Sequence, residues 1–366
     1  LFKEIKKIPP ASISYFKNDN FIHDIYFNSD NLKISGNLKI ILKECLNKTL
    51  NKFKSKGIKN ILLFSGGKDS SLIAQYLIEK KINFIPVIIN TYPKIYEFEA
   101  NKINAMNVAK KNNLKLFSIN INLNKINEKD ILQSMLFDFH FSILHFEGIK
   151  KIKKIFGKRI NIICGQSADS IFSFGASANT WSHLITRISY LYNNFFLKVL
   201  ITQILQNKYK KKLNFFNIKK EYLFFFSFYY YLLIEKKLFD KSLKTRNIID
   251  KIKIKLQNKE DFFMYLKIFG FLQGSDNQVV VNSCKKNNTN IIMPFLDPQL
   301  IYGIIKKKNK IKDIFFPKYP ILELLNKSYF SEKVKINNSR KLYNLNYKKI
   351  EINLKKKFLK KIRSLN

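Results

Sequence analysis

Glycine and proline are scarce in this chain, with 11 Gly and 8 Pro among 366 residues. A hydrophobic content of 46% and an aromatic content of 14% nevertheless exclude a disordered chain. The length is sufficient for one large domain or two smaller ones with a buried core. Because glycine is so rare, the adjacent pair in the stretch LFSGGKDSS (63–71) indicates a specific local requirement.

Cysteine is scarcer still, and Cys45, Cys164 and Cys284 lie far apart with no CxxC pair. This spacing excludes a disulfide framework and a zinc knuckle, and it favours a cytoplasmic location, where thiols stay reduced. Long apolar runs are also lacking. The most apolar stretch, YLFFFSFYYYLLI (222–234), is too short to span a bilayer and predicts a buried helix. The opening residues, LFKEIKKIPP, lack the apolar core of a signal peptide.

Acidic residues are few, with 26 Asp and Glu against 67 Lys and Arg, and the formal net charge is +41. Such a charge suggests nucleic acid or an anionic membrane as a partner. The excess is nearly all lysine, however, whereas nucleic-acid readers use arginine for bidentate contacts. The lysines are spread along the chain together with abundant Asn, Ile, Phe and Tyr, the residues of A/T-rich codons. We therefore attribute the charge to genome composition and do not expect a nucleic-acid partner.

Short apolar runs and stretches of helical periodicity alternate through the first half of the chain. The apolar runs predict buried strands over 60–64, 84–91, 115–121 and 160–165. The periodic stretches predict helices over 40–53, 70–80 and 97–112. This alternation predicts an α/β fold of Rossmann type, with a parallel sheet flanked by helices.

From about residue 180 onward the pattern is mostly helical, so we expect a helical C-terminal part. The sequence divides into four segments on this basis. Residues 1–35 form a lead-in with one or two strands, and residues 36–180 form the α/β core. Residues 181–334 form the helical part, and residues 335–366 form a basic, weakly patterned tail.

The glycine pair falls at the turn between strand 60–64 and helix 70–80. Ligands of open α/β sheets bind at the carboxyl ends of the strands. Glycines there let the backbone approach a phosphate, and the following helix presents N–H groups and a positive dipole end. An aspartate in such an anion site implies a metal, such as Mg²⁺, that bridges it to the phosphates. The residues that we expect at the pyrophosphate are Ser65, Gly66, Gly67, Lys68, Asp69, Ser70 and Ser71; the alternative is a tight turn with a helix cap.

SGGKDSS resembles the PP-loop of ATP pyrophosphatases, enzymes that split ATP into AMP and pyrophosphate. Asparagine synthetases, GMP synthetases, sulfate-assimilation enzymes and tRNA-modifying enzymes all carry this loop. Two later segments favour the asparagine synthetases: GQSADSIFSFG (165–175) resembles their GEGADELFGGY segment, and MPFLDPQLI (293–301) resembles their PFLD segment. The motifs occur in the family's order and cover nearly the whole chain. The resemblance implies a PP-loop, HUP-like core and a synthetase domain without its glutaminase half.

The resemblance implies a carbon–nitrogen ligase that uses ATP and Mg²⁺ to adenylate a carboxylate and then forms an amide with ammonia or an amine. Mg²⁺, helix N-termini and lysines offset the repulsion between the carboxylate and the triphosphate in such a reaction. Asp69 and Asp169 are the implied Mg²⁺ ligands; the alternative for Asp169 is a helix cap. The expected nucleotide contacts are Gly165 and the backbone of Val87, Ile88, Ile89 and Asn90, a strand end that borders the loop.

The chain departs from the family at two places. Gln166 stands where the family has an acid associated with amide formation, and a carboxamide cannot take a proton from an attacking amine. Three alternatives follow. Another group could take that proton, the substrates could differ from aspartate and ammonia, or the second half-reaction could be lost. The family's R-x-K is also missing at its usual spacing. Lys341 or Lys335 is a candidate for its lysine, and Lys318 resembles a further family lysine, with a surface charge as the alternative.

The family's glutaminase uses an amino-terminal cysteine, whereas the first cysteine here, Cys45, lies in a predicted helix. Ammonia or an amine is therefore expected from solution, from a separate glutaminase subunit or from an upstream portion. The carboxylate, whether aspartate, a sugar acid or a peptide, stays open. The alternatives are a PP-loop enzyme that modifies tRNA or sulfur compounds, which should lack the two later segments, and a catalytically impaired nucleotide-binding relative, which would explain Gln166.

Overall fold

The computed structural model describes residues 12–17, 20–25, 36–53, 57–94, 96–134, 143–172, 275–307, 316, 318–329 and 346–364. The chain divides into two compact units. The first comprises Leu1–Ser167, Gln273–Leu300 and Pro320–Asn366, and the second comprises Ala168–Leu272 and Ile301–Tyr319. The four sequence segments stay predictions, and the helix expected over 222–234 lies outside the described residues.

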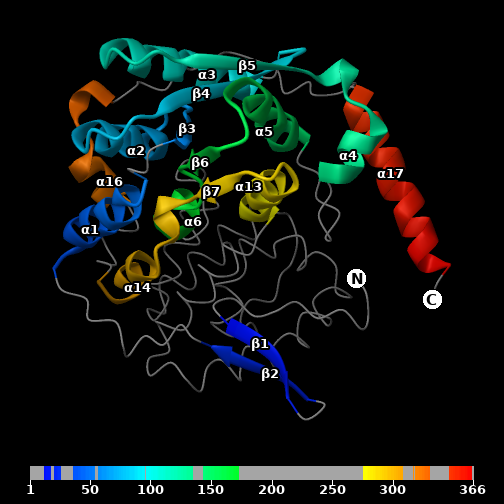
Figure 1. Ribbon diagram of the computed structural model, residues 1–366, viewed down its shortest axis with the longest axis horizontal. Helices are drawn as coiled ribbons and strands as arrows, with labels where there is room; N and C mark the ends of the chain where they lie inside the picture. Colours follow the sequence, from blue (N-terminus) through cyan, green and yellow to red (C-terminus); the bar gives the residue numbers. More distant parts are fainter. Residues whose placement is uncertain are drawn as a thin grey trace, which may run out of the picture. The chain divides into compact units, whose positions relative to one another are not determined.

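A five-stranded parallel sheet forms the centre of the first unit (Figure 1). Its strands are β3 (Lys59–Leu63), β4 (Ile85–Tyr92), β5 (Phe117–Asn122), β6 (Ile160–Cys164) and β7 (Asn290–Ile292). The strand order is β5-β4-β3-β6-β7, and every pairing is parallel. The sheet confirms the α/β, Rossmann-like fold class, and its first four strands match the four apolar runs. β7 was not predicted.

Helices cover both faces of this sheet. Connections between parallel strands are right-handed, which places α2 (Lys68–Glu79) and α3 (Tyr96–Lys111) on one face, and α1 (Leu38–Asn51) packs against α2. The return crossing from β5 to β6 places α5 (Ile143–Phe156) on the other face, beside α13 (Ser275–Lys286). The core between α5, α13 and the sheet contains Ile61, Val87, Ile119, Ile149, Ile152, Ile162, Val280 and Cys284.

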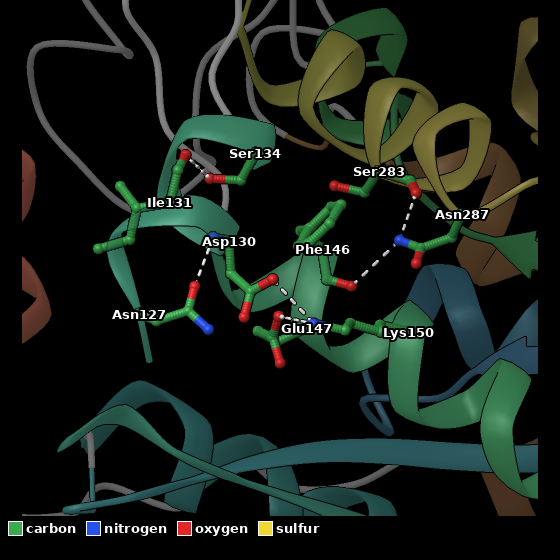
Figure 2. Close-up of polar contacts among 9 residues, drawn as sticks. All are labelled: Asn127, Asp130, Ile131, Ser134, Phe146, Glu147, Lys150, Ser283 and Asn287. Carbon is green, nitrogen blue, oxygen red and sulfur yellow. Dashed lines mark hydrogen bonds and ion pairs between the residues drawn. The ribbon is translucent and has the colours of Figure 1, made fainter. Parts of the chain in front are cut away.

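Polar contacts fix the crossover helix α5, which the sequence did not predict (Figure 2). Lys150 Nζ lies 2.8 Å from Asp130 Oδ1 on α4 (Glu128–Ser134) and 3.3 Å from Glu147 Oε1. Burial raises the pKa of the Glu147 carboxyl, an effect that the nearby Lys150 ammonium opposes. Asn287 Nδ2 donates to the Phe146 carbonyl, which ties the end of α13 to α5.

The remaining described elements precede and follow the sheet. β1 (Ser12–Lys17) and β2 (Asn20–Ile25) form an antiparallel hairpin, which confirms strands in the lead-in. The helices after β6 confirm a helical C-terminal part. Among the described residues they are α6 (Ala168–Phe172), α13, α14 (Pro298–Lys307), α16 (Tyr319–Leu324) and α17 (Asn346–Arg363), with the short 3₁₀ turns η5 (Pro294–Leu296) and η6 (Lys327–Tyr329). A further 3₁₀ turn, η2 (Leu123–Lys125), follows β5. Within the described ranges, no helix combines the length and apolarity needed to cross a membrane.

The order in which strands are added to the sheet reverses at the β3–β6 boundary. β3 is the first strand of the sheet along the chain and lies at its centre, with β4 and β5 added on one side. β6 and β7 are then added on the other side of β3. Open α/β sheets bind ligands at the carboxyl ends of the strands where such a reversal occurs. The turns that follow β3 and β6 therefore define the place to look for a site.

Candidate functional site

The stretch after β3 leaves the carboxyl end of the sheet and enters α2 through the glycine pair. The Phe64 N–H donates to the Val87 carbonyl at 2.8 Å, so β3 stays anchored to β4 up to the turn. Gly67 is the extended residue before the helix, and its carbonyl accepts from the Ser71 N–H at 2.9 Å. The N-terminus of α2, with its positive dipole end, is thus placed beside the centre of the sheet.

Gly66 is required by its backbone conformation and by its surroundings. Its φ is +68°, which favours glycine, and a β-carbon there would lie 2.4 Å from the carbonyl carbon of Asn104 in α3. A β-carbon has a fixed position on the backbone and the α3 atom is itself backbone, so no change of rotamer could relieve this contact. At Gly67 the nearest atom to a β-carbon would be Ser65 Oγ, at 3.3 Å. The loop therefore lies directly against α3 at Gly66, which explains one glycine of the pair.

Three serine hydroxyls line the start of α2. Ser65 Oγ accepts from the Gly67 N–H at 3.3 Å and lies 3.3 Å from Ser70 Oγ, which contacts the Gly67 carbonyl at 3.2 Å. Ser71 Oγ is buried and makes no hydrogen bond in the part of the chain that the structure describes. Asp69 lies in the first turn of α2 with a buried Oδ1 atom, and Lys68 is exposed. Hydroxyls, helix N–H groups and one carboxylate are thus concentrated in a single turn.

The turn after β6 contacts the first turn of α2. A β-carbon built on Gly165 would lie 3.1 Å from the Ser70 nitrogen and 3.2 Å from Asp69 Cβ. The next residue, Gln166, is partly exposed, and its N–H donates to Cys164 Sγ at 3.4 Å. Because β3 and β6 are neighbouring strands, both turns leave adjacent strand ends, as the sequence analysis required for a shared site.

These residues fit a triphosphate with a bound Mg²⁺. Gly66 leaves no room for a side chain and Gly165 leaves little, and the helix end and the serines supply hydrogen-bond donors for phosphate oxygens. Asp69 supplies an oxygen ligand of the kind that Mg²⁺ prefers. Among the described residues, no three His, Cys, Asp or Glu side chains gather as a metal site. A Mg²⁺ ion here would therefore take several ligands from phosphate and water, which is its usual behaviour.

Asp169 lies in the second unit, in the first turn of α6. Its Oδ1 atom is 2.8 Å from Lys318 Nζ in the same unit. The Lys318 side chain is only 13% exposed, whereas that of Asp169 is 59% exposed. Lys318 is thus a largely enclosed, paired cation, which argues against the plain surface charge. A Mg²⁺ ion shared by Asp169 and Asp69 stays a prediction.

The residues expected at adenine and ribose lie within β4, which continues to Tyr92. The Val87 and Ile88 side chains are buried, so only backbone could serve there. Alternate residues of a strand direct their backbone N–H and C=O groups to the same side. The Val87 carbonyl faces β3, so the backbone groups of Ile89 face the same side. Ile89 lies beyond Val87, which forms the last residue pair with β3, at Leu63. The buried Asn90 amide donates to Ser118 Oγ and Asn120 Oδ1 on β5. The nucleotide role of these residues stays a prediction.

The PFLD segment has a structural role in the first unit. Asp297 Oδ1 accepts from the Gln299 N–H at 2.9 Å, which caps α14, and it lies 3.6 Å from Cys45 Sγ on α1. Lys341 and Lys335 lie outside the described residues. Ser167 and Asn277, which are hydrogen-bonded in the turn after β6, were not singled out from the sequence, although Ser167 lies within the segment GQSADSIFSFG.

The fold is that of a Rossmann-like α/β protein, in which the turn after the central strand β3 leads through Gly66 and Gly67 into α2. No family model matches the sequence, and no curated protein matches it either. The resemblance to asparagine synthetases therefore depends on the sequence motifs of this chain alone.

Proposed function

We propose that this chain is an ATP-dependent enzyme of the asparagine synthetase class, which activates a carboxylate with release of pyrophosphate and then forms an amide. The observation that carries the proposal is that the turns after β3 and β6 lie beside each other, at the boundary where the order of strand addition reverses. Gly66 packs on α3, and Gly165 packs on Asp69 and Ser70. This arrangement concentrates anion-binding groups at the position where open α/β sheets bind nucleotides.

In the proposed reaction, the loop residues hold the pyrophosphate portion of ATP. The N-terminus of α2 and the hydroxyls of Ser65 and Ser70 donate hydrogen bonds, and Gly66 lets the loop lie against the backbone of α3. Asp69 holds Mg²⁺, with Asp169 as the second carboxylate implied by the sequence. When bound, Mg²⁺ would neutralise charge on the phosphate oxygens and so make the α-phosphorus a better target for the attacking carboxylate. The backbone from Val87 to Asn90 seats the adenine and ribose.

Lys318 adds a positive charge in the second unit, beside Asp169. A largely enclosed ammonium stabilises negative charge on phosphate or carboxylate oxygens more strongly than an exposed one, because less water screens it. Lys318 is therefore a second candidate, beside Lys341, for the lysine that assists the adenylation step.

Gln166 bears on the second half-reaction, amide formation. Its carboxamide can orient a substrate by hydrogen bonding but cannot accept the proton that an attacking amine must lose. We infer that amide formation depends on another base or on an acceptor other than ammonia. Gln166 also favours a second candidate function, a relative that binds and activates ATP but lacks the second half-reaction. Ammonia would come from solution or from a separate glutaminase subunit, in a cytoplasmic setting.

The proposal is tested by product analysis. The purified chain is incubated with ATP, Mg²⁺ and a panel of carboxylates that includes aspartate, sugar acids and peptides, and the products are identified by mass spectrometry. Formation of AMP and pyrophosphate that depends on one carboxylate supports the proposal. Formation of ADP and phosphate, or no turnover with any carboxylate, contradicts it. A reaction without added carboxylate controls for plain hydrolysis.

A further inference from the structure

Ser167, in the turn after β6, has a backbone conformation that residues other than glycine rarely adopt. Its φ is +81°, and its side chain is 4% exposed. Residues held in this region cost free energy and persist only where the surroundings enforce them. Such outliers collect at functional sites, and this one lies beside the proposed nucleotide loop.

The side chain of Asn277 is hydrogen-bonded to Ser167 in this conformation. Ser167 Oγ donates to Asn277 Oδ1 at 2.8 Å, and Asn277, on α13, is also 4% exposed. A hydrogen bond buried in this way is strong because little water competes for either partner. The two residues are 110 positions apart, so the bond ties the turn to a helix that enters the fold much later.

The held turn determines where Gly165 lies. Gly165 is two residues before Ser167, and a β-carbon added to it would lie 3.1 Å from the Ser70 nitrogen and 3.2 Å from Asp69 Cβ in the first turn of α2. If Ser167 relaxed to negative φ, the turn of residues 165–167 would change its course, and we expect Gly165 to lose its packing against the first turn of α2. The bond between Ser167 and Asn277 therefore acts, through the turn, on the residues proposed to hold pyrophosphate and Mg²⁺.

We propose that Asn277 is a positioning residue: it holds Ser167 at positive φ and so keeps Gly165 packed against the first turn of α2. The effect on turnover depends on the proposed function, whereas the effect on loop geometry does not. Glycine adopts positive φ without strain, so the turn of the Ser167→Gly variant should need no support from Asn277. This difference provides the test.

The test compares the unmodified chain with Asn277→Ala, Ser167→Gly and the double variant, by hydrogen exchange of the backbone amides of 165–167 and 68–70. We expect Asn277→Ala to accelerate exchange at both turns roughly tenfold, because the local opening becomes easier. In the Ser167→Gly background, the same substitution should change exchange by less than about threefold. Asn282→Ala is the matched control, since Asn282 lies on the same helix and its Nδ2 atom makes no hydrogen bond within the described residues.

A kinetic measurement separates positioning from general destabilisation. In exchange of labelled pyrophosphate into ATP, Asn277→Ala should lower kcat by about tenfold to a hundredfold, since small misplacements of catalytic groups have effects of that size. Ser167→Gly should restore most of this loss in the double variant. Asn282→Ala should leave kcat unchanged.

Three results would overturn the inference. The first is unchanged amide exchange at 68–70 in Asn277→Ala. The second is an effect of Asn277→Ala on exchange that is equal with and without Ser167→Gly. The third applies if Asn277→Ala does not fold: the double variant Ser167→Gly/Asn277→Ala should then fold, and its failure to fold would contradict the inference. Absence of pyrophosphate exchange in the unmodified chain would contradict the proposed function alone, because the amide measurement needs no activity.

Discussion

Gly66 and Asn104 lie so close that no side chain fits between them. A β-carbon on Gly66 would be 2.4 Å from the Asn104 carbonyl carbon, and the loop therefore runs directly along the backbone of α3. The proposed nucleotide loop is thus held from α3 on one side and from the turn after β6 on the other, where Gly165 contacts Ser70.

We expect Gly66→Ala to destabilise the fold and to displace the loop. Positive φ and backbone overlap together should lower the free energy of unfolding by roughly 2–4 kcal/mol, measured by urea denaturation. Gly57→Ala is the control, because Gly57 also has positive φ, at +88°, but nothing lies within 4 Å of its added β-carbon. It should lose only about 1 kcal/mol. Equal losses in the two variants would show that α3 does not confine the loop.

The ion pair between Lys318 and Asp169 should be measurable in a double-mutant cycle. We expect Lys318→Met and Asp169→Asn to show a coupling energy of about 0.5–1 kcal/mol in chemical denaturation, since exposed Asp169 limits the gain. High salt should reduce the coupling. A coupling energy near zero at low salt would mean that Lys318 is a surface charge after all.

Gln166→Glu should affect the two half-reactions differently. Adenylation does not need the acid at this position, so pyrophosphate exchange should change little. Amide formation from ammonia should rise, because general acid–base assistance is worth roughly 10²–10⁴-fold. Amide product is quantified by mass spectrometry, with Gln166→Met as a control of similar size. Asparagine synthesis by the unmodified chain at the rate of the Gln166→Glu variant would contradict the role assigned to Gln166.

All three cysteine thiols should be inert in the folded chain. Burial raises the pKa of Cys45 and Cys284 to about 12 and that of Cys164 to about 11, from an ordinary value of 9.0. The folded thiols stay protonated while those of the unfolded chain ionise, so their contribution to stability is intact below pH 9 and is lost as pH rises toward 12. A thiol reagent at about pH 8, below the ordinary thiol pKa, should label the chain only in denaturant. Rapid labelling of the folded chain would contradict this burial.

Much of the sheet could be predicted because its longer strands contain short apolar runs. Ile61 and Leu62 on β3 and Ile162 and Ile163 on β6 are consecutive apolar residues that are all buried, as expected for strands covered on both faces. β7 has only three residues, too few for any periodicity to appear. The crossover helix α5 was not predicted, although Phe146, Ile149 and Ile152 give it an apolar face.

The glycine pair and the serines around it identified the loop, but the sequence could not supply its supports. Gly66 is constrained by Asn104, and Ser167 is held by Asn277, far along the chain. Nothing in a single sequence marks a serine as having positive φ. The partner of Lys318 was likewise invisible, because its pairing with Asp169 depends on tertiary contacts between residues far apart in the chain.

Pyrophosphate exchange in Asp69→Asn tests the central claim, carboxylate activation at this loop, most directly. The substitution removes an oxygen ligand of the proposed Mg²⁺ with almost no change in volume. Glu128→Gln is the control, because Glu128 is also an acid in the first turn of a helix, α4, away from the loop. With Mg²⁺ and the preferred carboxylate, the unmodified chain and Glu128→Gln should exchange labelled pyrophosphate into ATP equally. Asp69→Asn should lose on the order of a hundredfold or more; near-normal exchange in Asp69→Asn would contradict the claim.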